Sequence, residues 1–204
     1  HLFMGLAEFI EPVFPYIELD IKQAEINISK KRYLAVLITS MFIFFFALAL
    51  ASFFVVISFG KQYLLFVTVT SFIILFIVYI NYVMYPKYVA EKRMKDIEKN
   101  LLPVLRNILM QLNSGVSLFT ALVSIKKGDF GHISKEFGKA IKEIDSGMEE
   151  AKALERLASG NPSFFFRRVI WQIVNGMKAG SDITKVLNEV MLILSEEQLN
   201  QIQG

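Results

Sequence analysis

The residues of this sequence that could do chemistry are few. The 204 residues include no cysteine and two histidines, His1 and His132, so disulfides, thiolate metal sites and cysteine nucleophiles are excluded and a histidine metal cluster has no support. Glu149 and Glu150 are adjacent, and adjacent side chains on a helix point about 100° apart. These two carboxylates therefore cannot share one acid–base site. We predict no catalytic residue, no cofactor site and no metal site.

The sequence also lacks the motifs that mark the best-recognised enzymes. None of the patterns GxxxxGK[ST], GxGxxG, GxSxG or HExxH occurs, so nucleotide-binding loops, nucleophile elbows and zinc-protease helices have no support. We interpret His132, in the stretch GHISKE, as an exposed histidine near the start of a helix. The protein is expected to be non-enzymatic.

Basic side chains are the remaining candidates for binding. Lys135, Lys139 and Lys142 are spaced i, i+4 and i+7, which places them in one stripe along a helix. Arg167 and Arg168 are more specific candidates, because arginine makes bidentate contacts with carboxylates. Two interpretations stay open: a solvated surface, or contact with an acidic partner or anionic lipid headgroups. The proposed partner-binding residues are Arg167, Arg168, Lys178, Lys135, Lys139 and Lys142.

Nucleic acid is not an expected partner. The formal net charge is only +3, which is small for a domain that neutralises phosphates.

Two long apolar stretches determine where in the protein these basic side chains can lie. The chain is 54% hydrophobic, above the roughly 45–50% of ordinary soluble domains. The run 33–59 is 27 residues long and the run 63–85 is 23 residues long, and both exceed the ~20 residues that span a bilayer. A domain of this size could not bury two helices that are apolar on all sides. The sequence therefore predicts a transmembrane helical hairpin over residues 33–85.

Flanking charges predict how the hairpin is oriented. Only Gly60, Lys61 and Gln62 separate the two runs, whereas clusters of basic residues lie on the other side of each run. The positive-inside rule then places both termini of this chain in the cytoplasm, as in a multi-pass protein of the cytoplasmic membrane. The flanking basic residues are Lys30, Lys31, Arg32, Lys87, Lys92, Arg93 and Lys95.

Residues 1–32 form a juxtamembrane amphipathic segment in this interpretation. Apolar residues recur at helical spacing and predict a short helix from about Ile17 to Ser29. This helix could lie in the membrane interface or dock onto the cytoplasmic domain, and the sequence favours neither.

Residues 86–204 are predicted to form a cytoplasmic, antiparallel six-helix bundle. Their short, well-marked connections favour helices that pack against their neighbours in the chain, and no strand pattern is found. The expected helices are Lys87–Ser114, Ser117–Lys126, His132–Asp145, Met148–Ala158, Ser163–Lys178 and Asp182–Gln201.

Caps and glycines mark the ends of these helices. Ser117 and Asp182 are placed to cap helices, and Asn161 with Pro162 is an N-cap and N1 pair. The glycines that we assign to turns and close helix approach are Gly115, Gly147, Gly176 and Gly180.

Aromatic residues supply much of the expected core of the fifth helix. Phe164, Phe165, Phe166 and Trp171 are predicted to be mainly buried, but three consecutive side chains cannot all face one side of a helix. At least one phenylalanine is expected to be exposed to a partner or to lipid.

Three stretches of the bundle resemble a known family. They are LLPVLRNILMQLNSGVSLFTAL (101–122), the GDFG element (128–131) with the helix ending in DSGMEEAKAL, and FFFRRVIWQIVNGMKAGSDITKVL (164–187). Together they resemble the cytoplasmic domain of the inner-membrane platform proteins of type II secretion, type IV pilus and archaellum machines, called the type II secretion system F domain. Trp171 and the paired Gly176 and Gly180 are most similar to the archaeal branch.

The resemblance implies a scaffold function. Platform proteins of this family couple a cytoplasmic, hexameric secretion ATPase to the assembly of pilin-like membrane subunits, and the chain is expected to form homo-oligomers in the lipid bilayer. Family members continue into further transmembrane helices, which we expect beyond Gly204. The alternative, from another class, is a membrane-anchored signalling or adaptor bundle.

Overall fold

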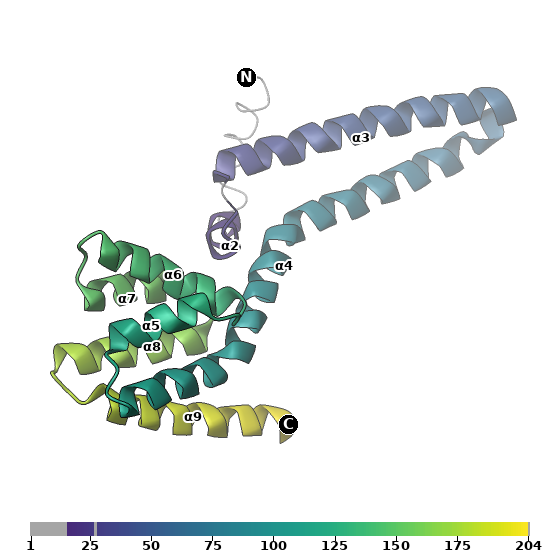
Figure 1. The fold of residues 1–204 in the computed structure, drawn as a ribbon. Coiled ribbons are helices and arrows are strands. Elements are labelled where there is room, and N and C mark those ends of the chain that lie inside the picture. Colours follow the sequence, from purple (N-terminus) through teal and green to yellow (C-terminus); the bar gives the residue numbers. More distant parts are fainter. Residues whose placement is uncertain (1–15, 27, 204) are drawn as a thin grey trace. The chain divides into compact units, whose positions relative to one another are not determined.

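The computed structural model describes residues 16–26 and 28–203, with the side chains of 197–203 left aside, and all regular structure in these ranges is helical (Figure 1). Contacts between residues divide the chain into two compact units, and the first unit ends at Ala90 and the second begins at Glu91. The predicted all-α fold, with two long apolar helices and a helical bundle, is confirmed.

The first unit contains α3 and the apolar first part of α4. Helix α3 covers Lys30–Phe59, and a short 3₁₀ turn, η2 (Lys61–Tyr63), leads into α4 (Leu64–Asn113). Gly60 makes the reversal between them with φ +98°, a conformation that residues with a Cβ avoid. The apolar windows of α3 and α4 have none of their residues buried. Helices of this length whose apolar side chains lie outside match lipid as their surroundings.

The two apolar helices also contact each other through polar atoms. The Tyr33 hydroxyl donates a hydrogen bond of 2.6 Å to the Tyr82 carbonyl, and the hydroxyl oxygens of Ser52 and Ser71 lie 3.1 Å apart. Hydrogen bonds between helices are favourable where no water competes for the polar groups. These two contacts join the helices near the start of α3 and again within its second half.

Ahead of α3, the helix α2 is shorter than predicted. It covers Ile17–Gln23, and the chain then turns through Glu25, which has φ +54°, so the expected helix to Ser29 is wrong after Gln23. Ile17 and Ile21 are buried against Tyr33 and Leu34 of α3. The part of the predicted N-terminal segment that covers residues 1–15, and Asn27, lie outside the described residues.

Helix α4 runs from the apolar hairpin into the second unit. It passes through Pro86 without a break in helical structure, although proline lacks the N–H that a helix interior uses. The expected first helix of the bundle is therefore the second half of α4. Its inner face carries Ile97, Leu105 and Ile108, all fully buried.

Five further helices complete the bundle, each packed against its neighbour in the chain from α5 to α9. Phe137 of α6 and Phe166 of α8 meet at its centre with ring centroids 5.7 Å apart. The predicted helices are confirmed, with ends shifted by at most two residues. The observed bounds are α5 Leu118–Lys127, α6 His132–Asp145, α7 Glu150–Ser159, α8 Phe164–Lys178 and α9 Ile183–Gln203.

Glycines close several of these helices. Gly115, Gly147 and Gly180 have φ of +82°, +98° and +65°. After each one, the next N–H donates to a carbonyl of the preceding turn, as Ser181 does to Gly176 at 2.9 Å, so orphan carbonyls at the helix end are satisfied.

Gly176 is different, because it lies within α8 rather than in a turn. A Cβ on Gly176 would lie 2.9 Å from a methyl group of Val186 on α9. This glycine therefore lets α8 and α9 approach each other closely.

Candidate functional site

The lysine stripe predicted on the third bundle helix lies on the outer face of α6. Lys135, Lys139 and Lys142 are exposed, while Ile133 and Phe137 of the same helix face the core. The strong separation of charged and apolar faces explains why this helix packs in one orientation.

A fourth lysine joins the stripe from α5. The side chain of Lys126 lies over Gly138 of α6, with its Cγ 3.6 Å from the place a Cβ would take. We call Lys126, Lys135, Lys139 and Lys142 the α6 lysine surface. Within the described part of the chain, Lys126, Lys135 and Lys142 make no ion pair, so their charge is available to a partner.

Lys139 differs from the other lysines because it is bound to a buried carboxylate. Its ammonium lies 2.8 Å from Oε1 of Glu136, and partial burial lowers the pKa of Lys139. Arg93 of α4 donates to the same oxygen at 2.7 Å, and Asn161 donates to Oε2 at 3.2 Å. Four side chains from α4, α6 and the α7–α8 connection thus form one network around Glu136.

Sequence reasoning did not find this network. We assigned Arg93 to the basic residues that set membrane orientation, but its side chain is only 4% exposed. A buried charge needs a partner, and Glu136 lies 43 positions away in sequence. Only the packing of α6 on α4 brings the two together.

The connection between α7 and α8 is held by further polar contacts. Ser163 caps α8 by accepting a hydrogen bond from the Phe166 N–H at 3.1 Å, and it donates to Glu98 of α4 at 2.8 Å. The prediction that Asn161 caps this helix is wrong. Because α8 begins at Phe164, Ser163 is the residue in the capping position, and the side-chain oxygen of Asn161 accepts the Ser163 N–H in the turn before the helix.

Arg167 serves the same connection rather than an outer surface. Its Nη1 donates to the carbonyls of Asn161 and Pro162 at 2.8 and 3.2 Å, and its guanidinium lies 5.9 Å from the centroid of the Phe164 ring. Carbonyls left without an N–H partner are thereby satisfied. The side chain is therefore part of the fold as well as a positive charge.

Two other predicted partner-binding residues lie on α8 and face different neighbouring helices. Lys178 forms an ion pair with Glu155 of α7. Arg168 is half-buried beside α9, where it lines a small crevice with Val190 and Ile193. The six predicted basic residues are thus divided between two surfaces, one on α6 and one on α8.

The aromatic side chains of α8 lie on different sides of the helix, some buried and some exposed. Phe166 is fully buried and Phe165 is packed against the core. Phe164 and Trp171 are 60% and 41% exposed. The expected exposed phenylalanine is therefore Phe164, and the prediction that Trp171 belongs to the core is wrong.

His132 has a structural partner. Its backbone N–H donates to Oδ2 of Asp96 at 2.7 Å, and its ring Nδ1 lies 2.7 Å from the same oxygen. Gly131, with φ +64°, makes this approach feasible, because a Cβ there would lie 2.5 Å from that carboxylate oxygen. Asp96 thus caps α6, a helix whose first residue we had interpreted as simply exposed.

The electrostatics of Asp96 follow from this cap. Burial alone would raise the pKa of its carboxyl group, but the hydrogen bonds from the His132 backbone and ring, with the nearby charges, outweigh burial and hold the pKa below its ordinary value of 3.8. The Asp96 carboxylate is therefore charged near neutral pH.

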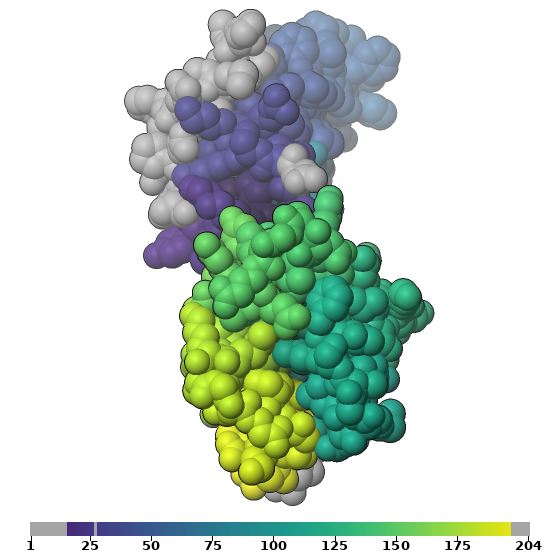
Figure 2. Space-filling model, turned by 60° about the vertical axis from the view of Figure 1, so that its left-hand side comes forward, coloured from purple at the N-terminus to yellow at the C-terminus, as the bar shows by residue number. Residues whose placement is uncertain are grey.

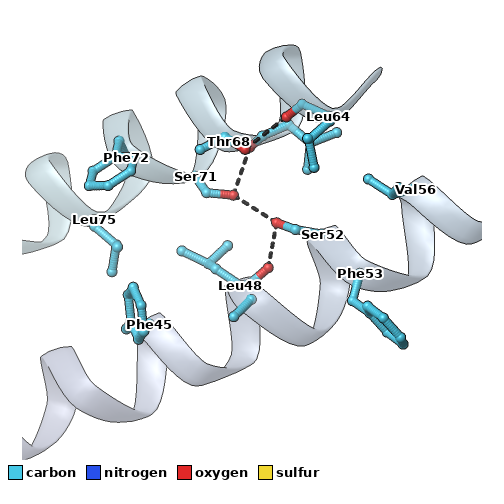
Figure 3. A pocket seen from close by; sticks show the side chains of 12 residues that line it. Phe45, Leu48, Ser52, Phe53, Val56, Leu64, Thr68, Ser71, Phe72 and Leu75 are labelled. Atoms are coloured by element: carbon cyan, nitrogen blue, oxygen red, sulfur yellow. Dashed lines mark hydrogen bonds between the residues drawn. The ribbon is translucent and has the colours of Figure 1, made fainter. Parts of the chain in front are cut away.

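The apolar hairpin carries a groove of about 460 Å³ between α3 and α4 (Figure 3). Ser52 and Ser71 point toward each other across it, and each oxygen also lies within hydrogen-bonding distance of a carbonyl of its own helix, Leu48 or Val67. The rest of the lining is largely apolar, including Phe45. The groove therefore has little to offer a polar ligand.

No group of three histidine, cysteine or acidic side chains that could hold a metal ion is found among the described residues.

Comparison with known proteins gives one match. Residues 104–204 match the family model described as type II secretion system (T2SS), protein F. No match was found among curated proteins or among solved structures. The matched stretch begins in the second half of α4 and includes α5–α9. Over these residues the chain is similar to the type II secretion system protein F family, and ahead of them it has two helices that are long and apolar enough to cross a membrane.

Proposed function

We propose that this protein is an inner-membrane platform subunit that couples a cytoplasmic, hexameric secretion ATPase to the assembly of pilin-like membrane subunits. The machine it serves is of the type II secretion, type IV pilus or archaellum kind. The observation that carries the proposal is the combination of a protein F domain with two apolar helices on one chain. Such a chain places a helical bundle next to a membrane.

The continuity of α4 supports a mechanical role. One helix, Leu64–Asn113, contains both the second apolar run and the first core positions of the bundle. The helix continues through Pro86, which removes one backbone hydrogen bond, and a helix resists twisting better than a loop. In this proposal, movement of the bundle by the ATPase is passed along α4 to the membrane segment.

Basic surfaces supply the contact with the ATPase. The α6 lysine surface and the arginines of α8 would attract acidic side chains and speed encounter with them. Orientation follows from the flanking charges: with Lys61 as the lone charge of the outer turn, both termini of this chain lie in the cytoplasm. The bundle then faces the compartment that holds ATP.

Affinity capture tests the proposal. The full chain, tagged and purified from membranes of its own cells, is expected to bring down the secretion ATPase encoded beside it and pilin-like proteins. A membrane-anchored signalling or adaptor protein would instead bring down regulators and change its oligomeric or phosphorylation state with a stimulus. Recovery of the chain without either class of machine component would overturn the platform function.

A further inference from the structure

Helix α4 contains a proline at the point where the apolar hairpin ends. In an α-helix each carbonyl accepts a hydrogen bond from the N–H four positions later, so the donor for the Tyr82 carbonyl should come from residue 86. That residue is Pro86, which has no N–H and whose ring crowds the same carbonyl. The helix continues past this point, and the Tyr82 carbonyl lacks the donor that a helix normally supplies.

The missing donor comes from the neighbouring helix. The hydroxyl of Tyr33 on α3 donates a hydrogen bond of 2.6 Å to the Tyr82 carbonyl. Neighbouring helices satisfy the backbone groups that prolines leave free in membrane helices. Tyr33, Tyr82 and Pro86 all belong to the first unit. We call this hydrogen bond the Tyr33 latch.

The Tyr33 side chain is held in position for this contact. Tyr33 lies in the first turn of α3, where Ser29 caps the helix by accepting the Arg32 N–H at 3.4 Å. Its ring is only 8% exposed, and it is buried against Ile17 and Ile21 of α2. The start of α3 and the packing of α2 therefore fix the hydroxyl next to α4, and little conformational entropy is lost when the bond forms.

The latch lies beside the junction of the two units. Pro86 is four residues before Ala90, where the first unit ends. In the second unit, the buried residues form one cluster that extends from Ile97 on α4 to Leu194 on α9, and Figure 2 shows α5–α9, in teal to yellow, packed against each other along the visible face. The bundle is therefore one body, and proline is a recognised cause of bending in the helix that joins it to the hairpin.

We propose that the Tyr33 latch sets the stiffness of α4 at Pro86. While the bond is made, the Tyr82 carbonyl is satisfied and the turn around Pro86 keeps one geometry. When the bond is broken, α4 bends at Pro86 and the bundle moves relative to the hairpin. Because α2 covers the Tyr33 ring, movement of α2 away from α3 releases the bond. Use of the latch to pass movement from an ATPase to the membrane rests on the proposed function, whereas the latch itself does not.

The test measures distances between two spin labels on the full chain in nanodiscs. The chain has no cysteine, so Gln62→Cys, in the turn between α3 and α4, and Ser146→Cys, in the turn between α6 and α7, can each carry one label. Both positions are exposed. Pulsed electron paramagnetic resonance gives the distribution of distances between the labels, and bending at Pro86 adds new distances to the main one.

Variants locate the cause of any bending. Tyr33→Phe removes the hydroxyl but keeps the ring, and it should raise the population at new distances, relative to the main distance, at least about fivefold, because a carbonyl is left unpaired. Pro86→Ala restores the N–H that Tyr82 lacks, so the double variant Tyr33→Phe, Pro86→Ala should return to the narrow distribution. Tyr88→Phe, at an exposed tyrosine of α4, is the matched control and should change nothing.

The part assigned to α2 has a variant of its own. Ile21→Ala removes part of the side chain that covers the Tyr33 ring, and it should raise the same population by less than Tyr33→Phe does. Its effect should disappear in combination with Pro86→Ala. An unchanged distribution in the folded Ile21→Ala chain would overturn the control of the latch by α2.

Recovery in the double variant separates a latch from a general loss of packing, because packing lost at Tyr33 cannot be restored at Pro86. An unchanged distribution in the folded Tyr33→Phe chain would overturn the latch, as would a broad distribution that Pro86→Ala does not narrow. If circular dichroism shows that Tyr33→Phe does not fold, the double variant decides: recovery of folding supports the latch, and continued misfolding overturns it. Failure to capture an ATPase would overturn the platform function alone, because the distance measurement contains no ATPase.

Discussion

Arg93 on α4 donates a hydrogen bond of 2.7 Å to Glu136 on α6, and both side chains are only 4% exposed. Burial of two opposite charges is costly unless their hydrogen bonds are satisfied. Here Lys139 and Asn161 also donate to Glu136. The pair therefore fixes how α6 lies on the helix that continues from the apolar hairpin.

The first prediction concerns this pair. Glu136→Ala leaves Arg93 charged and buried and should lower the free energy of unfolding of the bundle by about 3–5 kcal/mol. The double variant Arg93→Met with Glu136→Leu should recover most of the loss, because two apolar side chains of similar volume replace the charges. Denaturant unfolding followed by Trp171 fluorescence measures both. Equal losses in the single and double variants would show that the charges are not coupled.

A second prediction concerns Gly131. Gly131→Ala should destabilise the bundle by about 2–3 kcal/mol, since alanine is strained at positive φ and its Cβ would displace the Asp96 carboxylate from the start of α6. Gly147→Ala is the matched control: Gly147 has φ +98° but open space around it. That variant should therefore lose only about 1–2 kcal/mol. A loss at Gly131 no larger than at Gly147 would contradict the close approach.

The success of the sequence analysis depended on local signals. Ser117 and Gly180 mark helix ends through contacts with residues a few positions away, so the ends of α5–α9 could be placed to within two residues. Arg93 and Trp171 could not be placed, because their surroundings are set by packing between helices far apart in sequence. Asn161 shows the same limit, since its contact with Glu136 joins residues 25 positions apart and has no local signal in the sequence.

The third prediction concerns pH. The folded-state pKa of Asp96 is lower than its ordinary value of 3.8, so its contribution to stability is fully present above that value and is lost as the pH falls through the folded-state pKa. Asp96→Asn should cost about 1 kcal/mol at pH 7, and the difference from the unmodified chain should shrink below pH 3.8. Asp129→Asn, at an exposed position, is the control. A pH-independent difference would contradict the role of the Asp96 charge.

A fourth prediction tests membrane orientation. The chain has no cysteine, so single cysteines can be introduced for labelling without background. Gln62→Cys, in the turn between α3 and α4, should react with a membrane-impermeant maleimide in intact cells. Ser146→Cys, in the turn between α6 and α7, should react only after the membrane is opened. The reverse pattern would invert the proposed topology and remove the bundle from the ATPase's compartment.

The platform function itself is tested most directly by binding. The full chain in nanodiscs is titrated with the purified secretion ATPase encoded beside it, at low and at high salt, together with a Lys135→Glu, Lys142→Glu variant and a control, Lys152→Glu, at an exposed position of α7. We expect binding of the ATPase to weaken as the salt concentration rises, because exposed charges are screened. The double variant should bind the ATPase at least several-fold more weakly than the unmodified chain, and the Lys152→Glu control should bind it equally well. Absence of binding by the folded chain at either salt concentration would contradict the central claim.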